Sequence, residues 1–560
     1  MLHKTNNRLL FLFLFIFVGS AFSKASTKIP PTDSPRLINI INFIRQTDYR
    51  LQDADSLLFD ATEKQIQLMK KYNLVGTFLL QYDALINPDY QKLLKNELTP
   101  DFEIGAWWEI TQPHVEAAGI TWRGKHRWVS TANIAFTTGY TQEEREKLVD
   151  VYMAKFKQIF GRYPKSVGSW FIDSHTLLYM YEKYQIVASS NCKDQVGTDG
   201  YTLWGGYWNQ AYYPSKLNAY MPAQTKESQI PVPIFRMLGS DPIYQYDMGV
   251  GTSGQGVITL EPVYRDGGMN KNWTTHFLKS IVDQPSLAFN YAQAGQENSF
   301  TWDEMKTGLE MQFPILDSLR NAGKIRVETL EQSGLWFKKM FDHTPATAVT
   351  ALDDYRDQGN KSVWYNSRYY RANLYWEKQG FRFRDIHLFD EGLKSAYYDK
   401  PGTGGQFFYS TLPFIDGFFW STQTERAGLR LVKNENGQQQ ELILKNPSVK
   451  ESAKDKLLIT CTDQFENTFT ITLSEQNIDV GCQPKDKKLN WFLELKVPKE
   501  RLDQLPFQAV ENKSIDALFQ DFAYKISFKK GYITKGNGND YVFRLYPSQH
   551  TVAIDMHASL

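Results

Sequence analysis

Carboxylate side chains recur at the ends of apolar, strand-like segments of this chain of 560 residues. Paired carboxylates can cleave a glycosidic bond: one protonates the leaving oxygen, and the other attacks the anomeric carbon or activates water. An acid in this position can also be a helix N-cap, a role that Asp favours, and Asp83 is our first candidate for it. The acids at or just beyond the segment ends are Asp48, Asp83, Glu109, Asp173, Asp194, Asp241 and Glu297.

Strand-like and helical segments alternate between residues 35 and 345. The strand-like segments are 37–48, 75–83, 103–110, 165–173, 187–193, 231–240, 286–294 and 325–330, and the helical ones are 61–72, 88–96, 141–160, 176–184 and 301–321. This alternation predicts parallel strands joined by crossover helices. About seven or eight repeats favour a (β/α)7-8 barrel over an open doubly wound sheet, and no G-x-G-x-x-G opens a helix. In such a barrel the chemistry lies at the carboxyl ends of the strands, where the acids are.

The pattern changes after Thr344-Pro345. Residues 346–425 are rich in Tyr, Trp and Phe, and we expect them to connect the barrel to a second domain and to wrap back onto it. From 426 to 560, short alternating apolar segments are separated by turn residues such as Asn436-Gly437, which is typical of a β-sandwich. The sequence therefore predicts a barrel over 35–345 and an accessory β-sandwich over 426–560.

Aromatic residues stand beside several of these acids, and aromatic faces are common platforms for sugar rings. A glycine-rich loop over 197–208, dense in Trp and Tyr, reads equally as a substrate-binding loop and as an Ω-loop packed by its own aromatics. Lys193, Arg236 and Arg45 are candidate partners for the carboxylate that must stay ionised. The predicted substrate-binding residues are Asp48, Glu109, Trp107, Trp108, Trp170, Asp194, Gln195, Asp199, Trp204 and Arg236.

The barrel segment resembles the glycoside hydrolase/deacetylase superfamily, which joins polysaccharide deacetylases to family 57 glycoside hydrolases. Glu103-Ile104-Gly105 followed by Trp107 is similar to the deacetylase segment that carries two metal-binding His. Trp107 and Thr111 stand in those places here, whereas Thr47-Asp48 matches that family's first Asp. The metal-binding pattern of the deacetylases is thus broken in this sequence.

Two further segments are similar to family 57. Gly168 to Asp173 resembles the segment in which a Trp precedes the nucleophilic acid, with Asp in place of Glu. Phe235 to Asp241 is similar to the later segment that carries the acid/base. The resemblance implies that Asp173 is the nucleophile or base and Asp241 the proton donor. Glu297, an acid at the end of another strand-like segment, is the alternative donor.

Three functions follow as hypotheses. The first is a glycoside hydrolase that uses paired carboxylates and needs no cofactor. The second is a metal-dependent polysaccharide deacetylase, with a divalent cation on Asp48 and His175 or His114. The third is a non-catalytic glycan-binding protein that has kept the barrel, because a fold does not guarantee chemistry. Under all three hypotheses we expect a carbohydrate as the partner. The glycoside hydrolase hypothesis expects no bound metal.

The first residues predict export. Lys4 and Arg8 precede an apolar run over 9–18, and small residues follow, so 1–23 reads as a cleaved signal peptide and 24–34 as a lead-in. No Cys lies near the cleavage region, which argues against a lipoprotein. We therefore expect a secreted or periplasmic chain without membrane insertion after cleavage. The net charge of +1 gives no support for a nucleic-acid partner.

Three cysteines remain in the sequence: Cys192, Cys461 and Cys482. Cys461 and Cys482 lie in neighbouring strand-like segments, and the sequence leaves open whether they form a disulfide, because pairing depends on geometry. Cys192 is expected to be a small buried apolar residue.

Overall fold

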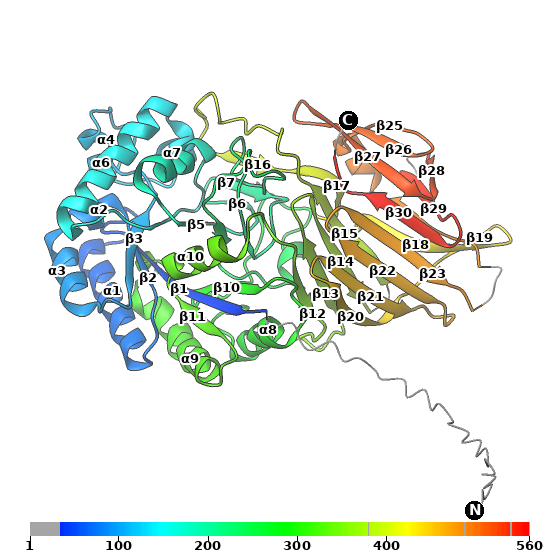
Figure 1. Ribbon diagram of the computed structural model, residues 1–560, viewed down its shortest axis with the longest axis horizontal. Coiled ribbons are helices and arrows are strands. Elements are labelled where there is room, and N and C mark those ends of the chain that lie inside the picture. The colour runs from blue at the N-terminus through cyan, green and yellow to red at the C-terminus, as the bar shows by residue number, and fades with distance from the viewer. Residues whose placement is uncertain (1–33, 379, 486–488, 538–539, 559–560) are drawn as a thin grey trace, which may run out of the picture. The chain divides into compact units, whose positions relative to one another are not determined.

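The computed structural model describes residues 34–378, 380–485, 489–537 and 540–558 (Figure 1). The expected signal peptide over 1–23 and almost all of the lead-in over 24–34 lie outside the described residues. Among the helices of the described part, none has the length and apolar character needed to cross a membrane.

Seven parallel strands form the barrel sheet, in the order β10-β1-β2-β3-β4-β5-β9. Nearly every residue of β1 is buried, as expected for a parallel strand covered on both faces. The strands are β1 (Arg36–Ile44), β2 (Thr77–Leu80), β3 (Glu103–Trp107), β4 (Ser166–Gly168), β5 (Ala188–Asn191), β9 (Ile234–Arg236) and β10 (Asn290–Ala294), with β8 (Ala211–Tyr212) antiparallel to β9 and β11 (Arg326–Glu328) beside β1.

Side-chain amides connect the two ends of this sheet, where β9 and β10 share no ladder. Gln293 accepts a hydrogen bond from the backbone N–H of Leu238 at 2.8 Å, and Gln210 donates to the side chain of Asn290 at 3.0 Å. The sheet is therefore nearly closed, and the predicted (β/α) barrel is confirmed.

Helices cover the outside of the barrel strands, as the blue to green part of Figure 1 shows. Helix α6 begins at Thr141 with the capping box predicted from Thr141 and Glu144. The helices are α1 (Ala54–Lys71), α2 (Tyr82–Ile86), α3 (Pro88–Glu97), α4 (Gln112–Ala117), α5 (Ala132–Ala135), α6 (Gln142–Phe160), α7 (Ser174–Tyr184), α8 (Lys271–Asp283), α9 (Thr301–Asn321) and α10 (Leu330–Met340), with 3-10 turns at Thr137–Gly139, Gln245–Asp247, Asn298–Phe300 and Lys499–Gln504.

Two antiparallel sheets form most of the rest of the described residues. The first has the order β12-β13-β14-β15-β18-β24-β29-β28, with β17 beside β15 and β19 beside β18. Its strands are β12 (Thr347–Ala351), β13 (Lys361–Asn366), β14 (Tyr370–Glu377), β15 (Gly380–Leu388), β17 (Leu412–Asp416), β18 (Gly428–Glu435), β19 (Gln438–Glu441), β24 (Trp491–Lys496), β28 (Tyr532–Lys535) and β29 (Phe543–Tyr546). Because β12 to β15 and β17 precede residue 426, the expected connecting region 346–425 supplies strands to the β-sandwich itself.

The second sheet has the order β20-β21-β22-β23-β30-β27-β26-β25. Alternate residues of β21 to β23 are buried, which places one face of each strand in the core of the sandwich. The strands are β20 (Lys445–Ala453), β21 (Lys456–Thr462), β22 (Thr468–Ser474), β23 (Asn477–Gln483), β25 (Phe507–Val510), β26 (Ser514–Phe519), β27 (Phe522–Lys530) and β30 (Thr551–Asp555).

The segment before β17 returns to the barrel, as expected for the aromatic-rich region. Strand β16 (Phe407–Ser410) pairs in parallel with β7 (Tyr201–Trp204), which pairs with β6 (Gln195–Thr198). Just upstream, the backbone N–H of Ala132 donates to Gly405, and that of Gly402 donates to Thr138. These bonds fix the loops that form one wall of the candidate site.

Cys461 and Cys482 do not form a disulfide in this fold. Cys461 on β21 lies opposite Phe469 on β22, and Phe469 lies opposite Cys482 on β23. One whole strand therefore separates them, roughly 10 Å at the usual strand spacing, which exceeds the reach of a disulfide. Both thiols are free and buried, as is Cys192.

We expect three reactive thiols per chain when the unreduced protein is denatured and titrated with a thiol reagent. The reason is that the sheet keeps Cys461 and Cys482 on separate, non-adjacent strands. A titre of one thiol per chain would contradict the strand order β21-β22-β23.

Candidate active site

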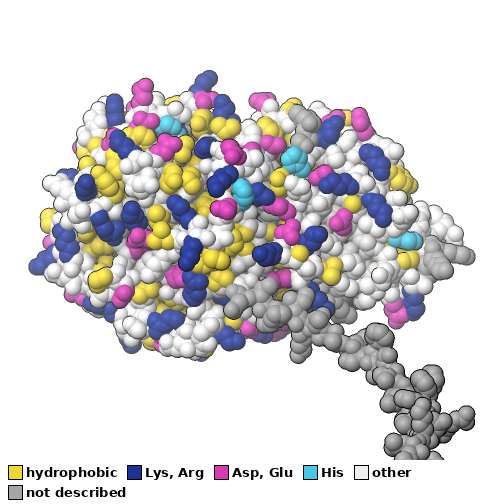
Figure 2. Space-filling view, in the orientation of Figure 1, with side chains coloured by type: hydrophobic (Ala, Val, Ile, Leu, Met, Phe, Trp, Pro, Cys, Tyr) yellow, Lys and Arg dark blue, Asp and Glu magenta, His cyan; other side chains and the backbone are white. Residues whose placement is uncertain are grey.

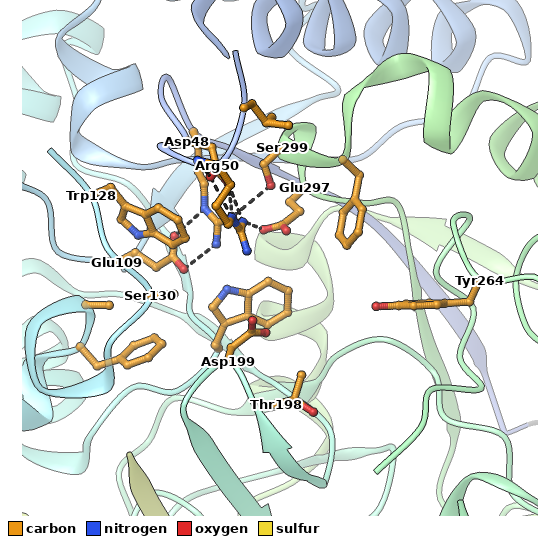
Figure 3. Close-up of a pocket in the computed structure, with 16 residues that line it drawn as sticks. Asp48, Arg50, Glu109, Trp128, Ser130, Thr198, Asp199, Tyr264, Glu297 and Ser299 are labelled. Atoms are coloured by element: carbon orange, nitrogen blue, oxygen red, sulfur yellow. Dashed lines mark hydrogen bonds and ion pairs between the residues drawn. The ribbon is translucent and has the colours of Figure 1, made fainter. Parts of the chain in front are cut away.

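A pocket of about 260 Å³ opens at the carboxyl ends of the barrel strands (Figure 3). Its charged residues follow β1, β3 and β10 and occupy the turn between β6 and β7. This is the edge at which parallel barrels carry their chemistry. The lining residues are Arg45, Asp48, Arg50, Leu51, Glu109, Trp128, Ser130, Ala135, Phe136, Trp170, Thr198, Asp199, Tyr264, Glu297, Ser299 and Phe300.

Arg45 is the centre of the charged wall. It follows β1 directly, and its guanidinium donates two parallel hydrogen bonds to Glu109, at 2.8 and 2.7 Å. Its Nη1 lies 2.8 Å from Oε2 of Glu297 and 3.9 Å from Oδ2 of Asp48. Bidentate pairing fixes the plane of a guanidinium, so Glu109 orients Arg45 toward the other two carboxylates. Arg45 also donates to the hydroxyl of Ser299 at 3.0 Å, and Figure 3 shows dashed lines that run to the labelled Glu109, Glu297 and Ser299.

A second arginine holds Asp48 from the solvent side. Arg50 donates from Nε to Asp48 at 2.8 Å and also pairs through Nη2. Both guanidinium groups lie over the ring of Trp128, at 4.3 Å for Arg45 and 5.3 Å for Arg50. Trp128 therefore packs against the cations that position Asp48 and Glu297.

The pKa values of two of these carboxyls are displaced in opposite directions. Burial raises the pKa of Glu297 to about 7, and the charges of Glu109 and Asp199 add to this while Arg45 opposes it. Burial also raises the pKa of Asp48, but hydrogen bonds from Arg50 and the charges of both arginines outweigh it, so the net pKa is lowered. One carboxyl that is protonated near neutrality thus lies beside one that stays ionised.

Asp199 faces the pocket from the turn between β6 and β7. Its backbone is left-handed, with φ of 51°. The surrounding protein raises the pKa of this carboxyl, although the residue as a whole is exposed and the charges of Arg45 and Arg50 oppose the shift. Among the described residues it has no hydrogen-bond or ion-pair partner.

Aromatic side chains supply the remaining walls. Trp170, which stands between β4 and α7 in the sequence, lines the pocket. Phe136, Tyr264 and Phe300 complete its apolar surface. The indole N–H of Trp128 is buried and has no hydrogen-bond partner in the described part of the chain. Of the predicted site residues, the pocket brings together Asp48, Glu109, Trp170, Asp199 and Glu297.

Asp173 lies outside this pocket, so the geometry does not support its predicted role as nucleophile. It is the N-cap of α7, where it accepts a hydrogen bond from the backbone N–H of Thr176 at 3.0 Å. It also accepts bonds from the hydroxyls of Thr137 and Thr176, each at 2.6 Å, and from Arg145 at 3.0 Å. Burial raises the pKa of Asp173, but these partners outweigh it and lower the pKa overall. Its oxygens are used to fix α7.

Replacing Asp173 with alanine is expected to destabilise the protein by about 3 to 5 kcal/mol, because it removes the cap of α7 and also the ion-pair partner of buried Arg145. Asp173→Asn keeps the cap and should cost less, and we expect kcat of the folded variant to stay within a few-fold of wild type. Denaturant unfolding and activity of the same preparations check both. A stable Asp173→Asn protein without turnover would show instead that Asp173 takes part in the reaction.

Asp241 has a similar structural role. Its carboxylate accepts bonds from the backbone N–H groups of Ile243 and Tyr244 and from the indole of Trp273 at 2.8 Å. Burial raises its pKa. It does not line the pocket, so its assignment as proton donor gains no support from the geometry.

Asp194 and Arg236 pair with each other instead of facing the pocket. Arg236 donates to Asp194 at 2.7 Å, and Arg371 of β14 contacts the other carboxylate oxygen. Arg371 in turn makes two bonds of 2.8 Å to Asp385 of β15. Neighbouring Gln195 is also buried, and accepts from Cys192 at 3.3 Å. This buried cluster connects the end of β5 to the β-sandwich sheet.

The other predicted tryptophans belong to the core. Trp107 is fully buried against Phe43, with ring centroids 4.2 Å apart, and Trp108 packs edge-on against Tyr152. Trp204 is buried and donates to Asp416 of β17 at 3.0 Å. These three side chains have no surface left for a sugar ring.

Sequence reasoning named Arg45 as a partner for a carboxylate but overlooked other pocket residues. Arg50 and Ser299 stand two positions from Asp48 and Glu297, so proximity to a predicted acid was an available signal. The others come from long segments between strands, where no periodicity marks them. Thr198 belongs to the loop 197–208 that was a candidate, and the overlooked residues are Arg50, Leu51, Trp128, Ser130, Ala135, Phe136, Tyr264, Ser299 and Phe300.

The pocket residues do not fit a divalent metal of the deacetylase kind. Such a site needs several His and carboxylate ligands that converge on one point. No group of three His, Cys, Asp or Glu side chains with that arrangement occurs within the described ranges. Trp107 is core, Thr111 donates to Asp83 at 2.6 Å, and the guanidinium of Arg45 already occupies the space between Glu109 and Glu297.

Comparison with known proteins gives similarity at the level of structure. No family model matches the chain, and no curated protein matches it. A solved structure described as belonging to the glycoside hydrolase/deacetylase class, from Parabacteroides distasonis, is 14% identical over 68% of this chain and 91% of that one, with a TM-score of 0.49.

Two further structures are more distant. One is described as a polysaccharide deacetylase from Mycobacterium smegmatis. It is 11% identical over 55% of this chain and 92% of that one, with a TM-score of 0.35. A family 4 acetyl xylan esterase from Clostridium thermocellum, in complex with cobalt, is 11% identical over 55% and 94%, with a TM-score of 0.25. These names agree with the resemblance predicted from sequence. Similarity at this level carries no argument about activity.

Proposed function

We propose that this protein hydrolyses a poly- or oligosaccharide, with Glu297 as the proton donor and Asp48 as the ionised carboxylate. The observation that carries this assignment is that both carboxyls lie at one guanidinium nitrogen, Nη1 of Arg45, at 2.8 and 3.9 Å. Those distances keep the two oxygens no more than about 7 Å apart, which is compatible with the roughly 5 to 9.5 Å found for the paired carboxyls of glycosidases.

The two carboxyls suit complementary roles. The pKa of Glu297, at about 7, lets its protonated form persist near neutral pH and give a proton to the leaving oxygen. The pKa of Asp48 is lowered, so this carboxylate remains charged as nucleophile or base. Arg45 holds both groups and Glu109 holds Arg45. The aromatic walls offer apolar surface to a sugar ring.

Deacetylation of a polysaccharide is the second candidate, and the names of the similar solved structures favour it. In that reaction a hydrolysed ester or amide releases acetate, and metal-dependent enzymes of this kind use a bound cation to activate water. The described residues of the pocket do not form a set of ligands that fits a divalent metal, so we place the deacetylase hypothesis second. A glycan-binding protein without catalysis remains the third hypothesis.

The test is a screen of the mature protein against plant, host and microbial polysaccharides, with and without a chelator. Reducing ends and released acetate are both measured. We expect new reducing ends that persist with chelator and that are lost in Glu297→Gln and Asp48→Asn. Acetate release that chelator abolishes would assign the deacetylase instead, whereas sugar binding without either product would assign the binding protein.

Export is part of the same proposal. The basic and apolar N-terminal residues support a secreted or periplasmic location, which would bring the protein to polysaccharides outside the cytoplasm. Expression of the full chain followed by N-terminal sequencing of the exported product should show cleavage near residue 23.

A further inference from the structure

The pocket has more negative than positive charge. Asp48, Glu109, Asp199 and Glu297 line it together with Arg45 and Arg50. When Glu297 is protonated, one negative charge still remains in excess. No Lys or His is among the described residues that line it. An anionic ligand would therefore enter against an unfavourable field, whereas a cation would be attracted.

The excess charge belongs to Asp199. Arg45 is committed to Glu109 and Glu297, and Arg50 is committed to Asp48. Asp199 has no such partner among the described residues, and it lies on the opposite side of the pocket from Glu297 (Figure 3). A carboxylate that accepts no bond from the protein is available to a group on the ligand.

The turn that presents Asp199 is fixed on both sides. The backbone N–H of Gly197 donates to the hydroxyl of Thr202 at 3.1 Å, and that of Phe407 on β16 donates to Gly200 at 3.0 Å. A Cβ atom at Gly197 would collide with the backbone oxygen of Ser253, so the turn also packs closely on that side. The backbone that carries Asp199 is therefore fixed before a ligand binds, which reduces the entropy cost of binding.

An independent feature of the pocket also calls for a ligand. The indole N–H of Trp128 is buried, with only 2% of the residue exposed, and has no partner in the part of the chain that the structure describes. An indole N–H is a donor only, so the partner that it lacks is an oxygen acceptor. The volume of about 260 Å³ is slightly below that of pockets for drug-sized ligands, at least about 300 Å³, and suits one sugar ring.

We propose that the ring bound in this pocket is an amino sugar with a free, protonated amino group, which pairs with Asp199. This inference rests on the proposed carbohydrate function and adds the class of sugar. An ammonium group offers three N–H donors, and the Asp199 carboxylate accepts no hydrogen bond from the described residues. Acetylation would remove the charge, and a uronic acid would add a second carboxylate beside Asp199 and Glu297.

Binding of single sugars tests the proposal without depending on turnover. The probes are methyl glycosides of glucosamine, N-acetylglucosamine, glucose and glucuronic acid, titrated into the mature protein and followed by calorimetry or ligand-observed NMR at about pH 6.5, below the usual pKa of an amine. We expect the glucosaminide to bind about tenfold more tightly than the glucoside, the scale of one charge-assisted hydrogen bond, and the glucuronide to bind most weakly.

Asp199→Asn is the decisive variant, because Asn tolerates the left-handed backbone at this position. It should abolish the preference for the amino sugar and leave affinity for the glucoside within a few-fold. Asp101→Asn is the matched control, since Asp101 is exposed and precedes β3 at the opposite edge of the barrel sheet. That control should keep the full preference.

The proposal is overturned if wild-type protein binds the glucoside as tightly as the glucosaminide, if the preference survives Asp199→Asn, or if none of the four sugars binds. Its failure differs from failure of the proposed function. Hydrolysis of a neutral polysaccharide without any preference for the amine would remove this inference alone. An Asp199-dependent preference without any hydrolysis would remove the catalytic assignment alone.

Discussion

Replacing Glu297 with glutamine is expected to lower kcat by about 10²- to 10⁴-fold on the polysaccharide that the screen identifies, the usual contribution of a general acid. Glutamine keeps the size of the side chain and a polar contact to Arg45 but has no acidic proton. KM should change much less, because ground-state binding depends on the walls and on the other charged residues.

The pH dependence of activity tests the same assignment of Glu297 as the proton donor. The pKa of Glu297 is raised to about 7, and the active form is the protonated one. Activity of wild-type protein should therefore be retained below about pH 7 and should fall as the pH rises through that value. The basic limb of the profile should disappear from the residual activity of Glu297→Gln, because that variant has no carboxyl to titrate at this position.

Glu310→Gln is the matched control, because Glu310 is exposed on α9. It should have wild-type kcat and a wild-type pH profile. Full turnover by Glu297→Gln, or an unchanged basic limb in that variant, would contradict the assignment of Glu297 as proton donor.

Replacing Arg371 with methionine is expected to lower the free energy of unfolding by about 3 to 5 kcal/mol, the usual cost of removing one partner of a buried ion pair. Arg371 is fully buried and pairs with both Asp194 and Asp385. Its removal leaves two buried carboxylates with less compensation, since Arg236 contacts only Asp194. Chemical denaturation, followed by circular dichroism, measures the loss.

Arg326→Met is the control for this prediction. Arg326 is an exposed residue of β11 and pairs with Glu328, and surface pairs contribute about 0 to 1 kcal/mol. A variant Arg371→Met as stable as Arg326→Met would show that the cluster between β5, β14 and β15 contributes little to stability. Because Arg371 belongs to the β-sandwich sheet and Asp194 follows a barrel strand, a large loss would also show that the sandwich stabilises the barrel.

Local pattern was sufficient for most of the barrel. Continuous apolar runs such as that of β1 mark strands that are buried on both faces, and the capping box at Thr141 and Glu144 marks the start of α6. The two longest helices that escaped this reasoning are α8 and α10; the short helices α2, α4 and α5 escaped it as well. Helix α8 contains a Thr pair and aromatic residues of low helix propensity, so its helical structure depends on packing against the barrel.

The division into domains shows the limit of composition as a guide. Residues 346–425 differ from the later segments in their aromatic content, and on that basis they were expected to be a connection. In the structure, β14 pairs with β15, and β15 pairs with β18, so both sides of residue 426 belong to one sheet. Strand pairing between distant segments depends on tertiary contacts that no local window contains.

The sequence by itself determined the edge of the barrel at which charged residues gather, because the end of each parallel strand can be located from its apolar run. The tertiary structure decided which of these residues share a pocket. Asp48 and Glu297 meet because β10 pairs with β1, whereas Asp173 caps α7 and Asp194 is paired with Arg371 of the β-sandwich. Proximity in space and the supply of arginines from distant segments, neither of which is visible in local sequence, separate a carboxyl suited to proton transfer from one that holds the fold together.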